Sequence, residues 1–263
     1  AVLLDRSLNV VRPTIIWTDQ RSVKECAALK RDHFDLIFKT AFQAPTPTWT
    51  LPQMLWLRNN EPRALKRTRH ILFVKDYVRY LLTGEMACDH IEAQGTLFWD
   101  MRKGCWSESL CDLAGLQLDR LPRIAKPTDL AGAITAQAAA DTGLPQGTPV
   151  IMGGSDSAVE DYAAGAIEPG QCILKLATAG NVNVMTAKPH PHRETLTYSH
   201  VVPGLWYTVT ATNSAAVCQR WYRDTFSAPG THYDELDRLA SGSPPGSNGV
   251  FFHPYLQGER SPY

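Results

Sequence analysis

A carboxylate close after a pair of glycines is the feature of this sequence best suited to chemistry. An apolar run over 149–152 ends at Gly153 and Gly154, and Asp156 follows after one intervening residue, Ser155. The glycines leave little side-chain bulk around this acid. It either caps the helix expected over 157–167 or accepts a proton from a bound hydroxyl group. The spacing leaves both roles open, and capping is the commoner one.

A second turn that suits ligand binding follows the strand expected over 172–176. Its residues are Ala177-Thr178-Ala179-Gly180, and another strand is expected after it. Further on, Asn213 is expected to cap a helix over 214–226 that begins with small residues, among them Ala216. Free amides and the positive dipole end at such a helix start suit a phosphate group. Ordinary close packing explains the small residues equally well.

Polar and aromatic residues near the N-terminus form a second candidate group. A strand is expected over 13–17, and Trp17, Asp19 and Arg21 alternate, so they would share a face if the strand continued. The alternative is a local Asp–Arg pair beside a buried indole. Trp49 follows a proline-rich loop, where its ring either packs on a sugar or, as we favour, in the core.

Charged residues interrupt an otherwise apolar run over 71–84, and more acids follow it. Lys75 and Asp76 lie inside the run, and Asp89 and Glu92 come after it. The later pair could be read as paired acids, or with His90 as a metal cluster. We favour a solvated turn that carries no chemistry.

The composition excludes several classes of protein. The 263 residues include 26 Lys+Arg and 26 Asp+Glu, so the formal net charge is zero, which argues against a general nucleic-acid binder. No apolar stretch approaches the roughly 20 residues that cross a bilayer. The six cysteines form no C-x-x-C pair, which leaves zinc unsupported and favours a reducing cytoplasm. His190 and His192 lie in a proline-broken loop, so no metal site is predicted there either.

The remaining pattern predicts the other elements and one boundary. We place the domain boundary between residues 153 and 154, so the parts are 1–153 and 154–263. The further elements expected are a hairpin of 1–4 with 10–11, helices over 22–38, 51–61, 136–141 and 233–239, and a strand over 205–211.

Several motifs in order along the chain resemble one family. The segments are GGSD at 153–156, AAGAIEPGQ at 163–171 and LATAG at 176–180, with W-x-D-x-R at 17–21 and a late F-x-x-P-Y-L-x-G-E-R-x-P at 251–262. Together they are similar to the FGGY family of carbohydrate kinases, and most of all to its xylulokinase branch. Two departures, Ala177 for glycine and Ala179 for serine, affect the second turn.

The resemblance implies roles for particular residues. Asp156 would be the base that accepts the proton of a sugar hydroxyl, and ATP with Mg²⁺ would be required. Gly154, Thr178, Gly180 and Ala216 would lie on the nucleotide and phosphate side. Asp19, Arg21 and Trp49 would lie on the sugar side, and Glu259 and Arg260 would form an ion pair on the cleft wall.

The family also implies a fold and an activity. The expected fold is the actin/hexokinase-like (ribonuclease H-like) α/β fold with two domains, incomplete at both ends. A first phosphate loop would lie before Ala1 and an adenosine site after Tyr263, so the chain alone is not expected to turn over. The expected reaction is ATP-dependent phosphorylation of D-xylulose to D-xylulose 5-phosphate, in the cytoplasm, with a homodimer possible.

Two other interpretations stay open. One is a non-catalytic sugar-binding or regulatory paralogue, which the alanines at 177 and 179 favour. The other is a kinase for a different ketose or polyol. A serine hydrolase using Ser155 or Ser157 is disfavoured because the G-x-S-x-G turn is missing.

Overall fold

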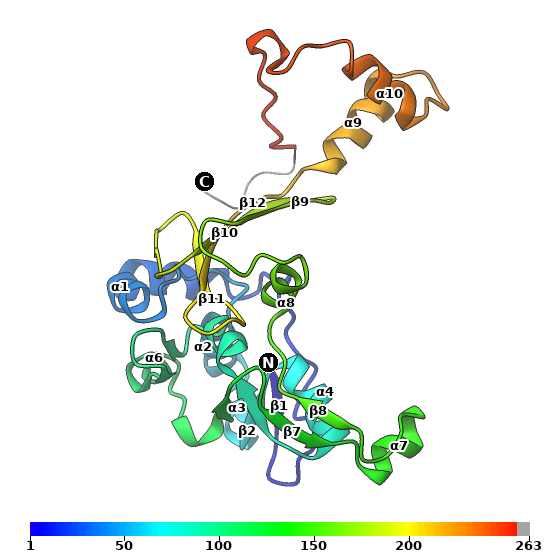
Figure 1. Ribbon diagram of the computed structural model, residues 1–263. Helices are drawn as coiled ribbons and strands as arrows, with labels where there is room; N and C mark the ends of the chain where they lie inside the picture. Colours follow the sequence, from blue (N-terminus) through cyan, green and yellow to red (C-terminus); the bar gives the residue numbers. More distant parts are fainter. Residues whose placement is uncertain (257–263) are drawn as a thin grey trace.

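The computed structural model describes residues 1–256, which form a body of helices and short strands, a larger sheet, and two helices beyond that sheet (Figure 1). The expected pair Glu259–Arg260 lies outside the described residues. The elements of the body are β1 (Val2–Leu4), α1 (Val23–Ala41), α2 (Thr50–Asn60), α3 (Pro62–Arg67), β2 (His70–Leu72), α4 (Val74–Thr83), β3 (Ala87–Asp89), α5 (His90–Gln94), β4 (Trp99–Asp100), β5 (Cys105–Trp106), α6 (Glu108–Ala114), η1 (Leu118–Arg120), β6 (Arg123–Ala125), β7 (Leu130–Ala133), α7 (Ala136–Thr142) and β8 (Pro149–Ile151).

The body encloses its own core around α2. Leu51, Met54 and Leu57 of α2 are buried together with Leu29 and Ile37 of α1. Seven of the eleven residues of α2 are buried because the helix lies between α1 and α6, and only its last turn is exposed. Each large side chain buried in this way contributes about 1.5–3 kcal/mol to folding. The body strands pair two by two, β1 with β2, β4 with β5 and β7 with β8 antiparallel, and β3 with β6 parallel.

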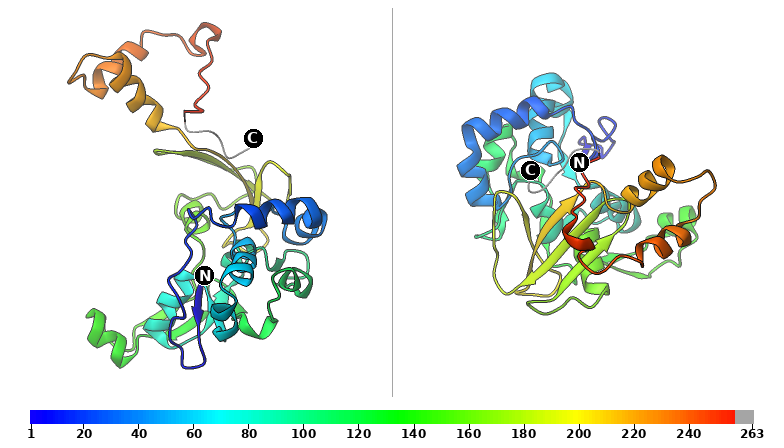
Figure 2. Two further views of the ribbon diagram at one scale, coloured as in Figure 1. Left: turned by 180° about the vertical axis from the view of Figure 1, so that it is seen from behind. Right: turned by 90° about the horizontal axis from the view of Figure 1, so that it is seen from above.

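The larger sheet is antiparallel, with the strand order β11-β12-β10-β9. Ala158, Tyr207 and Met185 form a core between α8 and this sheet, and Ile91 of α5 joins the same core. The view from behind shows the last two helices standing away from the body (Figure 2). The elements of this part are α8 (Asp156–Ala163), β9 (Cys172–Leu176), β10 (Gly180–Thr186), β11 (Leu196–Ser199), β12 (Trp206–Thr212), α9 (Ala216–Phe226), α10 (Tyr233–Ala240) and η2 (Ser247–Gly249).

Two sequence-based predictions about strands had different outcomes. The N-terminal hairpin is confirmed in a short form, because Leu4 bridges to Val10 and the Asp5 side chain accepts from the turn amides of Ser7 and Asn9. The strand over 13–17 is wrong, because residues 13–16 form no regular secondary structure and a turn begins at Trp17. The alternative of a buried indole at Trp17, the last residue of this segment, is wrong as well, because Trp17 is 65% exposed.

Each predicted helix is present, but several ends differ, and α1 runs to Ala41 instead of ending at residue 38. The helix expected over 157–167 ends at Ala163, because Gly165 at φ 81° takes the chain out of the helical region. The helix expected from residue 214 begins at Ala216, so Asn213 is not its N-cap. Ser22 is the N-cap of α1, but its hydroxyl donates to the carbonyl of Pro47 instead of capping the helix. No helix within residues 1–256 combines the length and the apolar character needed to span a bilayer.

Candidate active site

The carboxylate of Asp156 is exposed at the start of α8. Strand β8 ends just before it, and Gly153 turns the chain with a φ of 73° that favours glycine. Ser155 is the N-cap and Asp156 is the first helical residue, and its Oδ1 accepts from the adjacent amide of Ser157 at 2.7 Å. Ser155 and not Asp156 occupies the N-cap position, but the Asp156 carboxylate accepts from the second amide of the helix, so the capping interpretation is confirmed only in part. The carboxylate is free to face a ligand.

Gly154 allows a close approach between three parts of the chain. A Cβ atom at this position would lie 3.3 Å from Cγ1 of Val201 and 3.6 Å from Cδ1 of Ile91. Gly154 thus faces apolar side chains, and its predicted part in phosphate binding gains no support from its surroundings. It lets α5 and the loop after β11 pack against the turn that carries Asp156.

Polar contacts beneath Asp156 attach α8 to the larger sheet. The hydroxyl of Ser155 is hydrogen-bonded to the phenol of Tyr207, and burial raises the pKa of Tyr207 well above its usual value. On the next turn of α8, Asp161 accepts from Nδ2 of Asn183 at 2.9 and 2.8 Å, and burial raises the pKa of Asp161. These bonds fix the helix that presents Asp156.

A buried network of charges lies next to this turn, where a solvated turn was expected. Nζ of Lys75 lies 3.0 Å from Oδ1 of Asp76 and 2.5 Å from Oδ2 of Asp89. Nη2 of Arg79 lies 3.0 Å from the same Oδ1 of Asp76. Both carboxylates are fully buried, so they are internal partners of two cations, and the prediction of a solvated turn is wrong.

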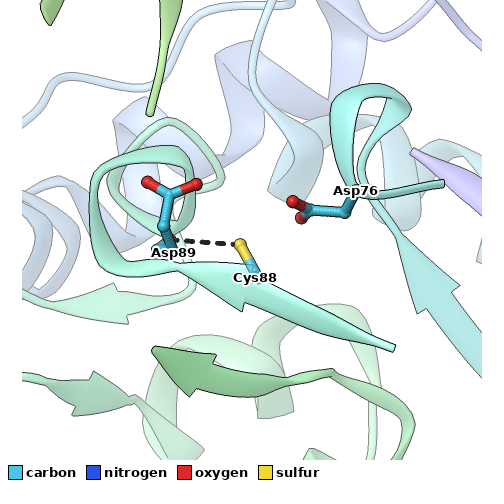
Figure 3. Close-up of side chains that lie close together, drawn as sticks. All are labelled: Asp76, Cys88 and Asp89. Carbon is cyan, nitrogen blue, oxygen red and sulfur yellow. Dashed lines mark hydrogen bonds between the residues drawn. The ribbon is translucent and has the colours of Figure 1, made fainter. Parts of the chain in front are cut away.

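Three side chains of this network approach each other closely enough to suggest a metal site. Potential ligand atoms of Asp76, Cys88 and Asp89 lie within 4.8 Å of one another (Figure 3). However, Lys75 and Arg79 already balance the two carboxylates. Burial also raises the pKa of the Cys88 thiol well above its usual value, which keeps it protonated. The group therefore fits a hydrogen-bonded charge network and not a metal site.

Glu92 is a half-buried acid that shares its surroundings with Asp156. Burial is the main cause that raises its pKa to about 7, and the charges of Asp76, Asp89 and Asp156 raise it further while Lys75 opposes them. Within residues 1–256 its carboxylate has no hydrogen-bond partner. Asp89 accepts from the amides of Ile91 and Glu92 at 3.0 Å and so sets the start of α5. Glu92 and Asp156 thus lie close enough to interact by charge, and neither forms an ion pair with a cation within residues 1–256.

The turn that carries Thr178 lies between β9 and β10 and is joined to α9. The amides of Ala215 and Ala216 donate to the carbonyls of Thr178 and Ala177, each at 2.8 Å. The expectation of free amides at the start of α9, including that of Ala216, is therefore wrong. A Cβ atom at Gly180 would lie 3.1 Å from Cβ of Ala215, so the glycine makes this approach possible.

Donors suitable for an anion are present in the turn itself. The side chain of Thr178 is exposed. No residue among 1–256 accepts a hydrogen bond from the amide of Thr178 or of Ala179. One hydroxyl and two amides are thus available at this point, and such a set of donors suits a phosphate.

The residues predicted for the sugar side show ordinary structural contacts. Nε of Arg21 donates to Oδ1 of Asp19 at 2.9 Å and Nη2 donates to Oδ2 at 2.8 Å, and the guanidinium lies 4.9 Å from the ring centre of Trp56. This hydrogen bonding lowers the pKa of Asp19. Trp49 packs against the body core and donates from Nε1 to the carbonyl of Ala44 at 3.2 Å. Asp19 and Arg21 thus form the local pair that was one alternative, and Trp49 packs in the core, which was the favoured alternative for its ring.

Arg79 was missed at the sequence level, although a signal existed. Asp76 and Arg79 are three residues apart inside an apolar run, and this spacing places charges on one helix face. Opposite charges on a face that should be buried indicate an internal ion pair.

Comparison with known proteins identifies the family. A model of the N-terminal domain of the FGGY family of carbohydrate kinases matches residues 1–161. The chain belongs to the FGGY family. It is 30% identical over 266 residues to the xylulose kinase of Bacillus subtilis, a match that covers 100% of this chain and 53% of that protein. It is 32% identical over 263 residues to the xylulose kinase of Lactococcus lactis, covering 100% of this chain and 52% of that protein.

Solved structures show the FGGY fold of the chain. The structure of xylulose kinase from Rhodospirillum rubrum has a TM-score of 0.92 at 30% identity, and the match covers 100% of this chain and 54% of that one. Glycerol kinase from Plasmodium falciparum, at 15% identity and a TM-score of 0.82, has the same fold. The predicted actin/hexokinase-like α/β fold is confirmed. The chain spans about half the length of the curated relatives that it matches.

Proposed function

We propose that the protein containing this chain is an ATP-dependent carbohydrate kinase that phosphorylates D-xylulose to D-xylulose 5-phosphate. The observation that carries the proposal is the exposed carboxylate of Asp156, which follows a glycine turn in a chain of the FGGY family. The similarity to xylulose kinases over the whole chain supports the choice of sugar. A second candidate is a kinase for another polyhydroxylated substrate, because an autoinducer-2 kinase of Escherichia coli is 30% identical over 255 residues.

The chain's own residues account for two parts of such a reaction. Asp156 accepts the proton of the attacking hydroxyl, and a base of this kind contributes roughly 10²–10⁴ in rate. The Thr178 hydroxyl and the amides of Thr178 and Ala179 hold phosphate oxygens, for which their free donors fit. When bound, ATP supplies the phosphoryl group and Mg²⁺ neutralises its charge. Phosphoryl transfer depends mainly on the alignment of the reacting groups. The rate of the proposed reaction therefore depends on the distance between the turn of Asp156 and the turn of Thr178.

Release of ADP by the full-length protein, measured against a panel of ketoses and polyols, tests this function. We expect release that depends on D-xylulose. Asp156→Asn should lower kcat by about 10²–10⁴ and leave sugar binding near normal. Glu160→Gln, on the same helix and in a surface ion pair with Lys175, is the matched control and should keep full activity.

Two outcomes would contradict the proposal in different ways. If no sugar on the panel stimulates ADP release, the protein is a non-catalytic paralogue, as the alanines at 177 and 179 would suggest. If Asp156→Asn turns over like the parent, Asp156 is not the base. A cytoplasmic location and a homodimer stay predictions, which fractionation and light scattering of the full-length protein would test.

A further inference from the structure

We propose that Arg79 is a positioning residue for Asp156, because its buried guanidinium holds the chain just before the glycine turn. Nη1 of Arg79 donates to the carbonyl of Met152 at 2.9 Å, and Nη2 donates to the carbonyl of Ala87. Met152 is the residue before Gly153, so this contact fixes the point from which the turn departs. This proposal rests on the proposed function only in those experiments that measure activity.

The segment of Met152 and Gly153 also forms backbone hydrogen bonds, but these bonds do not involve α4, the helix that carries Arg79. The amides of Met152 and Gly153 donate to the carbonyls of Asp129 and Pro127, each at 2.9 Å. These bonds attach the segment to the loop before β7. Gly153 has a positive φ and no side chain, so the turn has little stiffness of its own. The Arg79 contact supplies the restraint on the opposite side.

An arginine suits this position for a geometric reason. Its planar fork of donors reaches two carbonyls at once, one at β3 and one after β8, with a fixed angle between them. The compact ammonium of a lysine cannot hold both carbonyls in the same geometry. Arg79 is only 4% exposed, and its Nε has no hydrogen-bond partner within residues 1–256. A buried donor without an acceptor costs stability, so the residue is not explained by stability alone.

The charge of Arg79 is balanced inside the same network that sets α5. Asp76 neutralises it and is shared with Lys75, and Lys75 in turn pairs with Asp89. Asp89 accepts from the first amides of α5, the helix that carries Glu92. One buried network therefore contacts both elements that flank the Asp156 carboxylate.

The test uses Arg79→Lys in the full-length protein. This substitution keeps the positive charge beside Asp76 but removes one of the two carbonyl contacts. Misplacing a reacting group by about 1 Å can cost up to roughly 10² in rate, so we expect kcat per folded molecule to fall about tenfold, with the sugar KM nearly unchanged. Arg123→Lys, at an exposed ion pair with Glu85, is the matched control and should change neither constant.

A double-mutant cycle separates positioning from a structural role. In an Asp156→Asn background, Arg79→Lys should cause no further loss of kcat, because the group that it positions is already inactive. An equal loss in both backgrounds would overturn the proposal, as would an unchanged kcat in the single variant. If Arg79→Lys does not fold, Asp76→Leu with Arg79→Met removes both charges and the contact together, a replacement that buried ion pairs often tolerate. That variant should show the same loss and the same dependence on Asp156.

Amide hydrogen exchange provides a readout that does not depend on activity. Arg79→Lys should speed exchange in the peptide 150–158 and leave the peptide 23–41 of α1 unchanged. Unchanged exchange in 150–158 would overturn the proposal. If the parent protein shows no sugar-dependent ADP release, the proposed function fails, but this measurement still decides whether Arg79 holds the turn.

Discussion

The turn that presents Asp156 and the turn that presents Thr178 are held in different ways. The first combines main-chain bonds from the amides of Met152 and Gly153 with a side-chain contact, since the buried guanidinium of Arg79 contacts the carbonyl just before it. The second depends on the main chain, since two amides at the start of α9 donate to its carbonyls and Gly180 allows the approach. The turn proposed to carry the proton acceptor thus depends in part on replaceable side chains. The turn proposed to bind phosphate depends on backbone bonds that most substitutions leave intact.

The largest effect should come from breaking the buried network next to the first turn. Asp76→Ala leaves Arg79 and Lys75 without a shared carboxylate, and removing one partner of a buried ion pair costs about 3–5 kcal/mol. Glu160→Ala removes a partly exposed pair with Lys175, and such pairs contribute about 0–1 kcal/mol. Denaturant unfolding of both variants measures the difference. Equal losses would show that the buried network does not stabilise the first turn.

The second turn should be sensitive to the size of residue 180. Gly180→Ala places a methyl group 3.1 Å from Cβ of Ala215 and 3.3 Å from the carbonyl of Lys175, and such overpacking costs about 1–3 kcal/mol. Adding Ala215→Gly removes the closest contact and should recover part of the loss. Gly95→Ala meets neighbours only at 3.5 Å and is the control. No recovery in the double variant would place the strain elsewhere.

Glu92 should make the stability near the first turn depend on pH. Its pKa is raised from 4.5 to about 7 in the folded state, so its favourable contribution is present below pH 4.5 and is lost as the pH rises through 7. At pH 8, Glu92→Gln should therefore be more stable than the parent by about 1–2 kcal/mol, a range reduced because the side chain is only half-buried. The difference should vanish near pH 4. A difference for Glu92→Gln that does not change between pH 4 and pH 8 would rule out the shift.

The smallest effect on stability is expected at Thr178. Its side chain is exposed, so Thr178→Val should change the free energy of unfolding by less than about 0.5 kcal/mol. Under the proposed function it should nevertheless raise the KM for ATP, because a donor to phosphate is lost. An unchanged KM for ATP would remove the Thr178 hydroxyl from the phosphate site, while the neighbouring amides would remain candidates.

The sequence predicted those features that depend on neighbouring residues. Strand β9 has the predicted bounds, and α2 lies one residue from its predicted position, because periodicity and proline placement determine both. The exposure of Asp156 followed from the glycines before it. The strand expected over 13–17 failed because a strand needs a partner, which a local pattern does not reveal.

Contacts between distant segments could not be predicted in this way. Arg79 and Met152 are 73 positions apart, so nothing in the local pattern connects the guanidinium to the turn. The amides at the start of α9 were expected to be free because their acceptors belong to the earlier turn, at Ala177 and Thr178. The domain boundary between residues 153 and 154 stays a prediction, and the packing of Ile91 with Ala158 crosses it.

That packing has a mechanical consequence. The side-chain amide of Gln94, at the end of α5, accepts from the backbone amide of Ser199 at 2.9 Å and donates to the Ser199 hydroxyl. Both groups of this side chain therefore bind strand β11. If the larger sheet moves relative to α1 and α2, either the hydrogen bonds between Gln94 and Ser199 break or α5 moves together with the sheet. In the second case α5 rotates about Asp89 at its N-terminus. Because Asp89 pairs with Lys75, Lys75 is then displaced as well.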